Sequence, residues 1–399
     1  MQKYTDSYQT AECSSIDLTT EENYLLQEEL ENIGKDVTAE NSLSQLVINQ
    51  QTDAGHARLL ETSTKFFNNY FNPLTQVLKA DIATAAGAVE AIDALLSSIC
   101  EQGDGVLIPV GSDLRIRHRS IFRPIEIDMT GLCSMSSKAI MSRLTIDVQK
   151  VHCRIRALIL TNPHKTLGRC YSQDMLEGCL KFCQSKDIHF ISDEEYALTA
   201  FSCAEITEPH PFISALSLNT RALKCDRARI HTIWRIDRGF GAGKYRLSFT
   251  VTQGNPKLIS QLTETRSSQA SVLSTAFTTA LLSSPTLPFL ITLNSARLAE
   301  AYMLITEFFT RRNVAYIPVS AGSNIFARLA PRAKTWEDEN LMIEKLRGAG
   351  VLVTSGQNCS GRPKAKGWVR LSFSVEPKRL QEALKRVDAA LGISMRSTM

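Results

Sequence analysis

The sequence lacks features that define several large classes of protein. Its ten cysteines include no Cys-x-x-Cys pair, it has no apolar run of about 18 residues, and residues 1–15 are polar. These absences argue against a zinc ribbon, a membrane span and a secretory leader. We therefore expect a chain of the reducing cytosol, without a membrane partner.

An excess of charge of one sign is missing too. The chain has 45 basic and 41 acidic residues, which gives a formal net charge of +4. The short basic run at 115–119 is typical of a solvated face, so we expect no nucleic-acid partner. Cys179 and Cys183 lie one helical turn apart beside Leu180, as small core residues do, and no metal site is expected.

What is present indicates two domains preceded by an arm. A chain of 399 residues with 43% apolar residues is long enough for two cores. Residues 1–45 are interpreted as an arm with one helix, capped by Thr19 or Thr20 and carrying acidic residues in its first turn. A second helix is predicted from Leu59 to Phe71, where an Asn-Pro pair ends it.

Residues 46–288 form the predicted large domain. Apolar runs at 106–109, 157–160 and 189–193 alternate with amphipathic stretches such as 175–183. Strands without polar alternation, separated by helices, favour a mostly parallel sheet covered on both faces. The carboxyl ends of such strands meet at one edge, where ligands bind, and Asp193 falls at such an end.

Residues 289–399 have a different pattern, which predicts a smaller α+β domain. A long helix is expected to run through Leu298 and Phe308, and a last helix through 380–391. Residues 368–373 alternate apolar and polar side chains, as a half-buried strand does. No internal repeat or low-complexity tract is present.

Four segments carry a family resemblance, in order and across nearly the whole chain. They resemble the TNPxNPLG, DEIY, SLSKDFGLPGFR and GWFRLCFA motifs of fold-type-I pyridoxal-phosphate (PLP) enzymes, in particular aminocyclopropane-carboxylate (ACC) synthases and class I and II aminotransferases. Here they read TNPHKTLG at 161–168, SDEEY at 192–196, RIDRGFGAGKYR at 235–246 and GWVRLSF at 367–373. Glu22-Asn23 and the stretch 71–73 match the ACC synthase branch.

The resemblance implies an aspartate aminotransferase-like fold with a seven-stranded sheet, and a homodimer. It also implies roles for individual residues. Asp193 would meet a pyridine nitrogen, Tyr196 a ring oxygen and Arg370 a substrate carboxylate. Arg246, with the loop that includes Gly87 and Ala88, would hold a phosphate. Glu22, Asn23 and His164 are placed with the substrate.

The same resemblance places Arg238 where the family keeps its Schiff-base lysine. A guanidinium stays protonated and cannot form an imine. Other cofactor positions differ as well: Lys165 replaces an asparagine, Val89 a threonine, and Arg235 and Asp237 two serines. The stacking aromatic falls near Ser112, and a tyrosine that crosses the dimer falls near Asp53. Arg238, Arg246 and Arg370 predict a strongly cationic pocket.

Three functions compete on this basis. The first is a repurposed fold that binds a carboxylate-bearing small molecule, with no PLP or with PLP held non-covalently, and catalyses a biosynthetic cyclisation, isomerisation or decarboxylation. Arg238, Lys165, Tyr196, Asp193 and His164 are its candidate groups. The second keeps PLP on a relocated lysine, Lys165, with Lys244 as the weaker choice. The third is a non-catalytic partner subunit.

Overall fold

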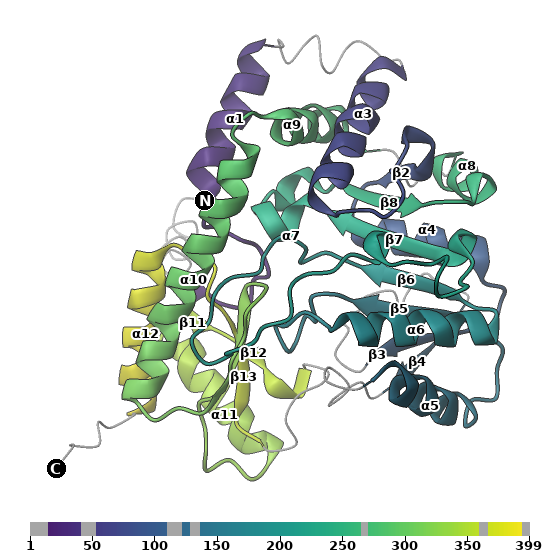
Figure 1. Cartoon of the computed structure of the whole chain (residues 1–399). Helices are drawn as coiled ribbons and strands as arrows, with labels where there is room; N and C mark the ends of the chain where they lie inside the picture. The colour runs from purple at the N-terminus through teal and green to yellow at the C-terminus, as the bar shows by residue number, and fades with distance from the viewer. Residues whose placement is uncertain are drawn as a thin grey trace, which may run out of the picture.

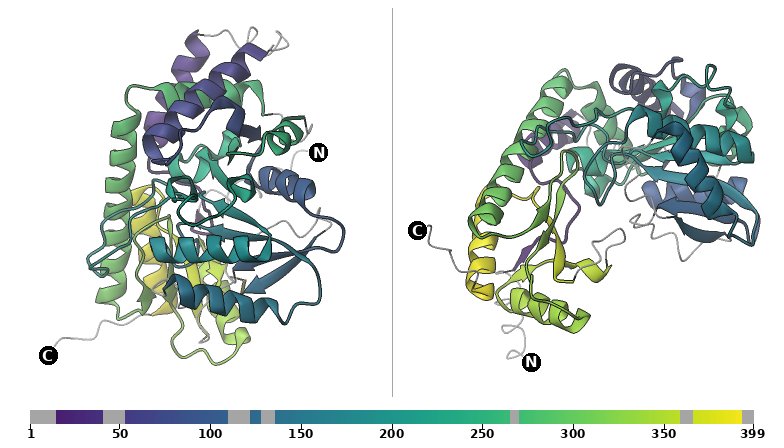
Figure 2. Two further views of the ribbon diagram at one scale, coloured as in Figure 1. Left: turned by 45° about the vertical axis from the view of Figure 1, so that its right-hand side comes forward. Right: turned by 60° about the horizontal axis from the view of Figure 1, so that its bottom comes forward.

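The computed structural model describes residues 15–40, 53–109, 122–127, 136–264, 270–358 and 366–392. A large twisted sheet with its helices forms one lobe, and a small sheet with α10 (Leu287–Arg311) and α12 (Pro377–Leu391) forms the other (Figures 1 and 2). Within the described residues no single helix is long and apolar enough to cross a membrane. The pair of α9 (Val272–Ser283) and α10, bent by 91°, passes that test of length and composition only when taken together.

The large sheet has the seven strands that the family resemblance implies. Its order is β2-β8-β7-β6-β5-β3-β4, and only β2–β8 and β8–β7 pair antiparallel. The apolar runs predicted as strands are β3, β5 and β6. The strands span Ile82–Ala85 (β2), Gly105–Pro109 (β3), Arg123–Ile127 (β4), Ile155–Thr161 (β5), His189–Asp193 (β6), Ile230–Arg235 (β7) and Ser248–Thr252 (β8).

Helices cover both faces of this sheet, which explains why its strands lack polar alternation. Alternate residues of β5 pack into different cores: Ile159 joins the side of α4 and α8, and Leu158 joins the side of α5 and α6. The predicted helix at 175–183 lies within α6. The covering helices are α3 (Asp53–Tyr70), α4 (Ala88–Ile99), α5 (Ser137–Val148), α6 (Gln173–Lys186), α8 (Pro256–Glu264) and α9 (Val272–Ser283).

The second lobe contains an antiparallel sheet of order β12-β13-β10-β9 packed under three helices. The strand predicted at 368–373 is β13, and the two predicted helices are α10 and α12. The elements are β9 (Tyr316–Ile317), β10 (Asn324–Arg328), β11 (Val351–Leu352), β12 (Thr354–Ser355), β13 (Trp368–Ser372), α10 (Leu287–Arg311), α11 (Trp336–Gly348) and α12 (Pro377–Leu391).

Short helical turns connect the longer elements. One of them, α7, follows β7 directly and carries Arg238. The predicted domain limits at 45 and 288 stay predictions, and α10 runs across the second of them. The turns are η2 (Lys79–Asp81), η5 (Ala215–Ser217), η6 (Arg227–Arg229), α7 (Ile236–Phe240), η7 (Gly243–Tyr245) and η9 (Gly356–Asn358).

The N-terminal arm differs from its prediction at the helix start. β1 (Ile16–Asp17) pairs in parallel with β11, and α1 (Gln27–Glu40) begins seven or eight residues after the threonines predicted to cap it. The hydroxyl of Thr20 accepts a hydrogen bond from the Glu22 amide instead. Because Leu18 and Asn23 bind other parts of the molecule, the intervening residues stay outside the helix and cross between the lobes.

We predict that Trp234 on β7 is critical for the stability of the large lobe. Its ring is fully buried against Phe66 of α3, with centroids 4.6 Å apart, and is stacked on Phe249 of β8. Trp234→Ala is expected to lower the free energy of unfolding by about 3–5 kcal/mol, measured by urea denaturation. Leu341→Ala, at a side chain 64% exposed, serves as the control. Equal effects of the two substitutions would refute this role.

Candidate functional site

The site starts at the carboxyl ends of three adjacent parallel strands. Thr161 ends β5, Asp193 ends β6 and Arg235 ends β7, and the register pairs Thr161 with Asp193 and Asp193 with Ile233. Lys165 lies in the turn that follows β5, and Arg238 lies in α7, which follows β7. The parallel topology explains why these segments and Asp193 meet at one sheet edge.

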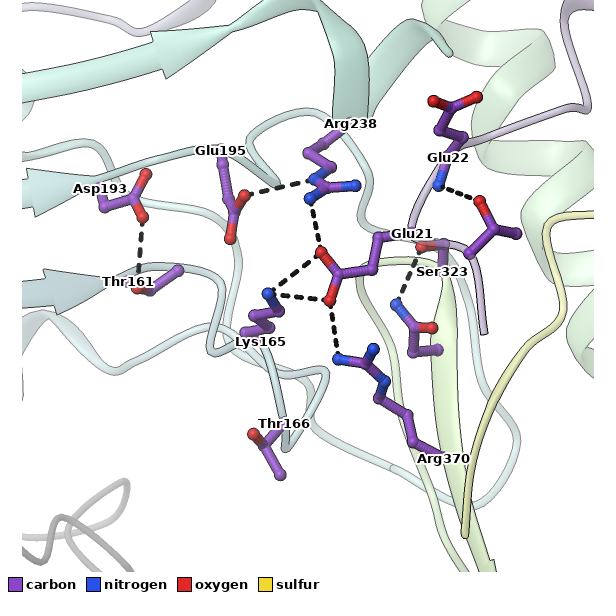
Figure 3. A network of polar contacts seen from close by, with 12 residues as sticks. Glu21, Glu22, Thr161, Lys165, Thr166, Asp193, Glu195, Arg238, Ser323 and Arg370 are labelled. Carbon is purple, nitrogen blue, oxygen red and sulfur yellow. Dashed lines mark hydrogen bonds and ion pairs between the residues drawn. The ribbon is translucent and has the colours of Figure 1, made fainter. Parts of the chain in front are cut away.

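A buried carboxylate from the arm occupies the centre of this edge. Glu21 lies with Lys165 Nζ 2.9 Å from its Oε1 and Arg370 Nη1 2.7 Å from the same oxygen. Arg238 Nη2 donates to its Oε2. Figure 3 shows the three cations converging on Glu21 from the turn after β5, from α7 and from β13. One side chain thus connects both lobes and the arm.

The backbone around Glu21 is held on both sides. The Leu18 amide donates to the Leu352 carbonyl, and the Leu18 carbonyl accepts from the Ser372 amide at 2.8 Å. Asn23 Nδ2 donates to the Gly239 carbonyl and to Asn294 Oδ1. A side chain at Gly241 would place its Cβ 1.8 Å from the Asn23 carbonyl, so this close approach requires glycine.

A second ion-pair group adjoins the first. Glu195 pairs with Arg235 and lies 3.4 Å from Arg238 Nε, and Arg235 Nε lies 3.2 Å from Asp237 Oδ1. Their side chains are at most 20% exposed. The pocket is therefore not the strongly cationic one predicted from its arginines, because buried carboxylates accompany the cations. The cluster contains Glu21, Lys165, Asp193, Glu195, Arg235, Asp237, Arg238 and Arg370.

Neighbouring charges determine the ionisation states of Glu21 and Arg238. Burial raises the pKa of Glu21, but Lys165, Arg238 and Arg370 outweigh that effect and hold the pKa far below its usual 4.5. Burial opposes the charge of Arg238, while the neighbouring Tyr196, Glu21 and Asp237 raise its pKa above the ordinary arginine value. Glu21 is an anion and Arg238 a cation throughout the physiological range.

Several buried polar atoms in and around the cluster have no hydrogen-bond partner among the described residues. Two of them, Asp193 Oδ1 and the Tyr196 hydroxyl, belong to residues that the family resemblance places with the cofactor ring. The other oxygen of Asp193 accepts from Thr161 Oγ1 at 3.4 Å. Burial is the main cause that raises the pKa of Asp193, against the lowering effect of Arg235 and Lys165. Unpartnered buried atoms cost free energy, so both atoms suit a ligand.

Three residues predicted to bind substrate lie around the cluster and have other contacts. His164 Nδ1 accepts from the Thr166 and Leu167 amides at 3.1 Å, and burial lowers its pKa to about 4. His164 is therefore neutral at pH 7 and holds the turn that presents Lys165. Glu22 points away from Glu21 (Figure 3) into a groove lined by Tyr24, Lys244 and Tyr245. Asn23 holds the arm in place through its hydrogen bonds to the Gly239 carbonyl and to Asn294.

The predicted phosphate loop also contains a carboxylate. Gly87, at φ +127°, is the N-cap of α4, which begins at Ala88. Glu90 lies in the first turn, where its Oε2 would be 2.8 Å from a Cβ at Gly87 and its Oε1 is 3.0 Å from Arg246 Nη2. Arg246 is 66% exposed and stands apart from the central cluster. The anionic side chain thus pairs with the arginine and places negative charge in the first turn of the helix, where the helix dipole favours it.

The class I and II aminotransferase model matches residues 15–387 of this chain. The chain belongs to this family. A probable aminotransferase, aclI, of Aspergillus oryzae is 37% identical over 381 residues, which cover 94% of this chain and 91% of aclI. The ACC synthase-like protein 1 of Mus musculus is 26% identical over 356 residues, 84% of this chain and 68% of that one. The ACC synthase-like branch predicted from the sequence is therefore represented among its relatives.

Two further comparisons show similarity to a trimodular protein and to a solved structure. The trimodular acetylaranotin synthesis protein ataIMG of Aspergillus terreus is 36% identical over 282 residues, 70% of this chain and 32% of ataIMG. Aspartate aminotransferase from Thermus thermophilus with maleate has a TM-score of 0.72 at 17% identity, covering 94% of this chain and 92% of that one. The aspartate aminotransferase-like fold is confirmed.

The side chains of this aminotransferase-family site do not fit a covalently held PLP. Asp193 Oδ1 and the Tyr196 hydroxyl suit the ring end of the cofactor. Arg238 offers no amine for an imine, and Lys165 is ion-paired with Glu21. Glu90 and Asp237 place negative charge in the two segments that the family resemblance assigns to a phosphate. The match of Arg238 to the lysine position rests on the sequence motif and stays a prediction.

Sequence reasoning missed Glu21, Glu195 and Glu90, which all lie next to motif residues. The available signal was the pair Glu21-Glu22: adjacent residues of an extended segment point to opposite sides, so one of the two faces the interior. Ser112 lies outside the described residues. Asp53 begins α3, and its predicted place near a partner subunit stays a prediction.

We predict that Glu21 stabilises the fold in a pH-dependent way. A lowered pKa in the folded state means that the contribution is fully present above the unfolded pKa of about 4.5 and is lost as the pH falls below it. Glu21→Gln is expected to lower the free energy of unfolding at pH 7 by about 3–5 kcal/mol. Urea denaturation should show this difference shrinking towards about pH 3. A difference independent of pH would contradict the assigned charge state.

Proposed function

We propose that this chain binds a carboxylate-bearing small molecule at Arg370, Lys165 and Arg238 and transforms it without a PLP imine. The observation that carries the proposal is the position of the Glu21 carboxylate. It already occupies the binding position between these three cations, which we name the carboxylate seat. The guanidinium of Arg370 and the ammonium group of Lys165 lie 2.7–2.9 Å from this carboxylate, so they can also bind the carboxylate of a ligand at the same position.

The groups beside this seat supply acid–base and electrostatic chemistry. Asp193, whose raised pKa favours the protonated form, and the Tyr196 hydroxyl both have an unpartnered oxygen beside the cluster. Asp193 would hold or deliver a proton, while Arg238 would stabilise negative charge that develops on the bound molecule. A cyclisation, isomerisation or decarboxylation of a carboxylate suits such a set.

The relatives support a biosynthetic setting for this reaction. The name of ataIMG assigns that protein to acetylaranotin synthesis, and the name of aclI describes a probable aminotransferase. We place this chain in a small-molecule biosynthetic pathway, as a cytosolic homodimer. A PLP enzyme with a relocated lysine is disfavoured, because Lys165 is ion-paired with Glu21 when no ligand is bound. A non-catalytic partner subunit remains the competing function, and it is favoured by the near-balance of charges in the cluster.

Maleate, the dicarboxylate that accompanies the Thermus thermophilus aspartate aminotransferase, is a suitable probe. Isothermal titration calorimetry should show that the wild-type protein binds maleate and that Arg370→Ala weakens binding by about tenfold or more. Arg347→Ala removes an arginine that is 61% exposed and lies outside the cluster, so it should leave binding unchanged. Absence of maleate binding in the wild type, or retention in Arg370→Ala, would refute the proposal and favour a partner subunit.

A further inference from the structure

Glu21 has contacts that exceed those of an ordinary structural ion pair. It is 8% exposed and meets one ammonium and two guanidinium groups that come from three separate segments. Each of these cations is at most 16% exposed on its side chain, so solvent contributes little to its stabilisation. Leaving any of them without an anion would cost several kcal/mol.

The seat therefore has room for one carboxylate at a time. A ligand carboxylate that enters while Glu21 stays would bring two anions to the same oxygen positions, at a separation where like charges repel strongly. A ligand that enters as Glu21 leaves would replace one carboxylate by another, and every cation would keep an anionic partner. Exchange of the Glu21 carboxylate for a ligand carboxylate therefore avoids both the repulsion between two anions and the loss of an anionic partner for the cations.

Movement of the arm backbone is not needed for this exchange. Leu18 and Asn23 fix the arm three residues before and two residues after Glu21. In the exchange that we infer, rotation about the side-chain bonds of Glu21 would withdraw its carboxylate while the backbone stays in place. The adjacent Glu22, which already points into the neighbouring groove, shows that this segment presents carboxylates in more than one direction (Figure 3).

We propose that Glu21 is an internal competitor that occupies the carboxylate seat and is displaced by the ligand. This inference rests on the proposed function, since it concerns the same seat. Glu21 sets the affinity and selectivity of the site: a ligand must outcompete a tethered carboxylate, so those that also use Asp193 or Tyr196 succeed over simple monocarboxylates. A tethered group acts at a high effective concentration, which makes it a strong competitor.

Removal of Glu21 tests the inference. Glu21→Ala is expected to bind acetate, and to bind maleate about tenfold or more tightly than the wild type, by isothermal titration calorimetry. Acetate should also restore the melting temperature of Glu21→Ala towards the wild-type value, because it fills the vacated seat. Glu61→Ala is the matched control: Glu61 also contacts two cations, Lys65 and Lys79, but is 51% exposed, so acetate should have no effect there.

The outcomes separate this inference from the proposed function. Equal maleate affinity in the wild type and in Glu21→Ala, within twofold, would overturn the competitor role and leave the carboxylate seat intact. Absence of maleate binding in both proteins would overturn the seat itself. If Glu21→Ala does not fold without anions, Glu21→Gln gives the same comparison with the side-chain volume retained. Failure of acetate to restore structure to Glu21→Ala would likewise count against the proposal.

Discussion

The site depends on the bonds that the Glu21 carboxylate forms with Lys165, Arg238 and Arg370. These cations lie on the turn after β5, on α7 and on β13, and Glu21 itself comes from the arm. Bringing three positive charges together away from solvent is unfavourable unless an anion accompanies them. The arm supplies that anion, so the junction between the two lobes is stable without any bound molecule.

Much of the large sheet is predictable from sequence, because its strands are buried on both faces. The predicted runs match β3, β5 and β6 closely; the runs in β3 and β5 are apolar, and β6 has a buried Phe-Ile pair between polar residues. Parallel pairing predicts that Asp193 lies at the ligand-binding edge, and the family resemblance places Lys165 and Arg238 beside it. Arg370 comes to the same place through the small sheet, which the family resemblance implied and periodicity did not.

The arm is where sequence reasoning failed. The acidic residues after Thr20 match the pattern of a capped helix, yet the chain stays extended there because Leu18 and Asn23 bind elsewhere. Such long-range bonds leave no local signal. The same holds for Glu195, which lies beside Arg235 only after β6 and β7 have paired. The sequence motifs therefore could not predict the charge balance of the pocket.

The family fold is retained while the charges in its site are altered. Glu21 and Glu90 lie against Arg370 and Arg246, which the family resemblance assigns to a substrate carboxylate and a phosphate. Asp237 stands where the resemblance expects a serine. In the function that we propose, the reaction at this edge of the sheet relies on the protein's own acids and cations.

The most direct measurement is mass spectrometry of the full-length protein after incubation with PLP and reduction with borohydride. If Glu21 keeps Lys165 paired, and a guanidinium stands at position 238, no lysine of the site should carry a pyridoxyl group. Glu21→Gln frees Lys165 from this partner and serves as the comparison. A stoichiometric pyridoxyl adduct on Lys165 or Lys244 of the wild-type protein would contradict the account.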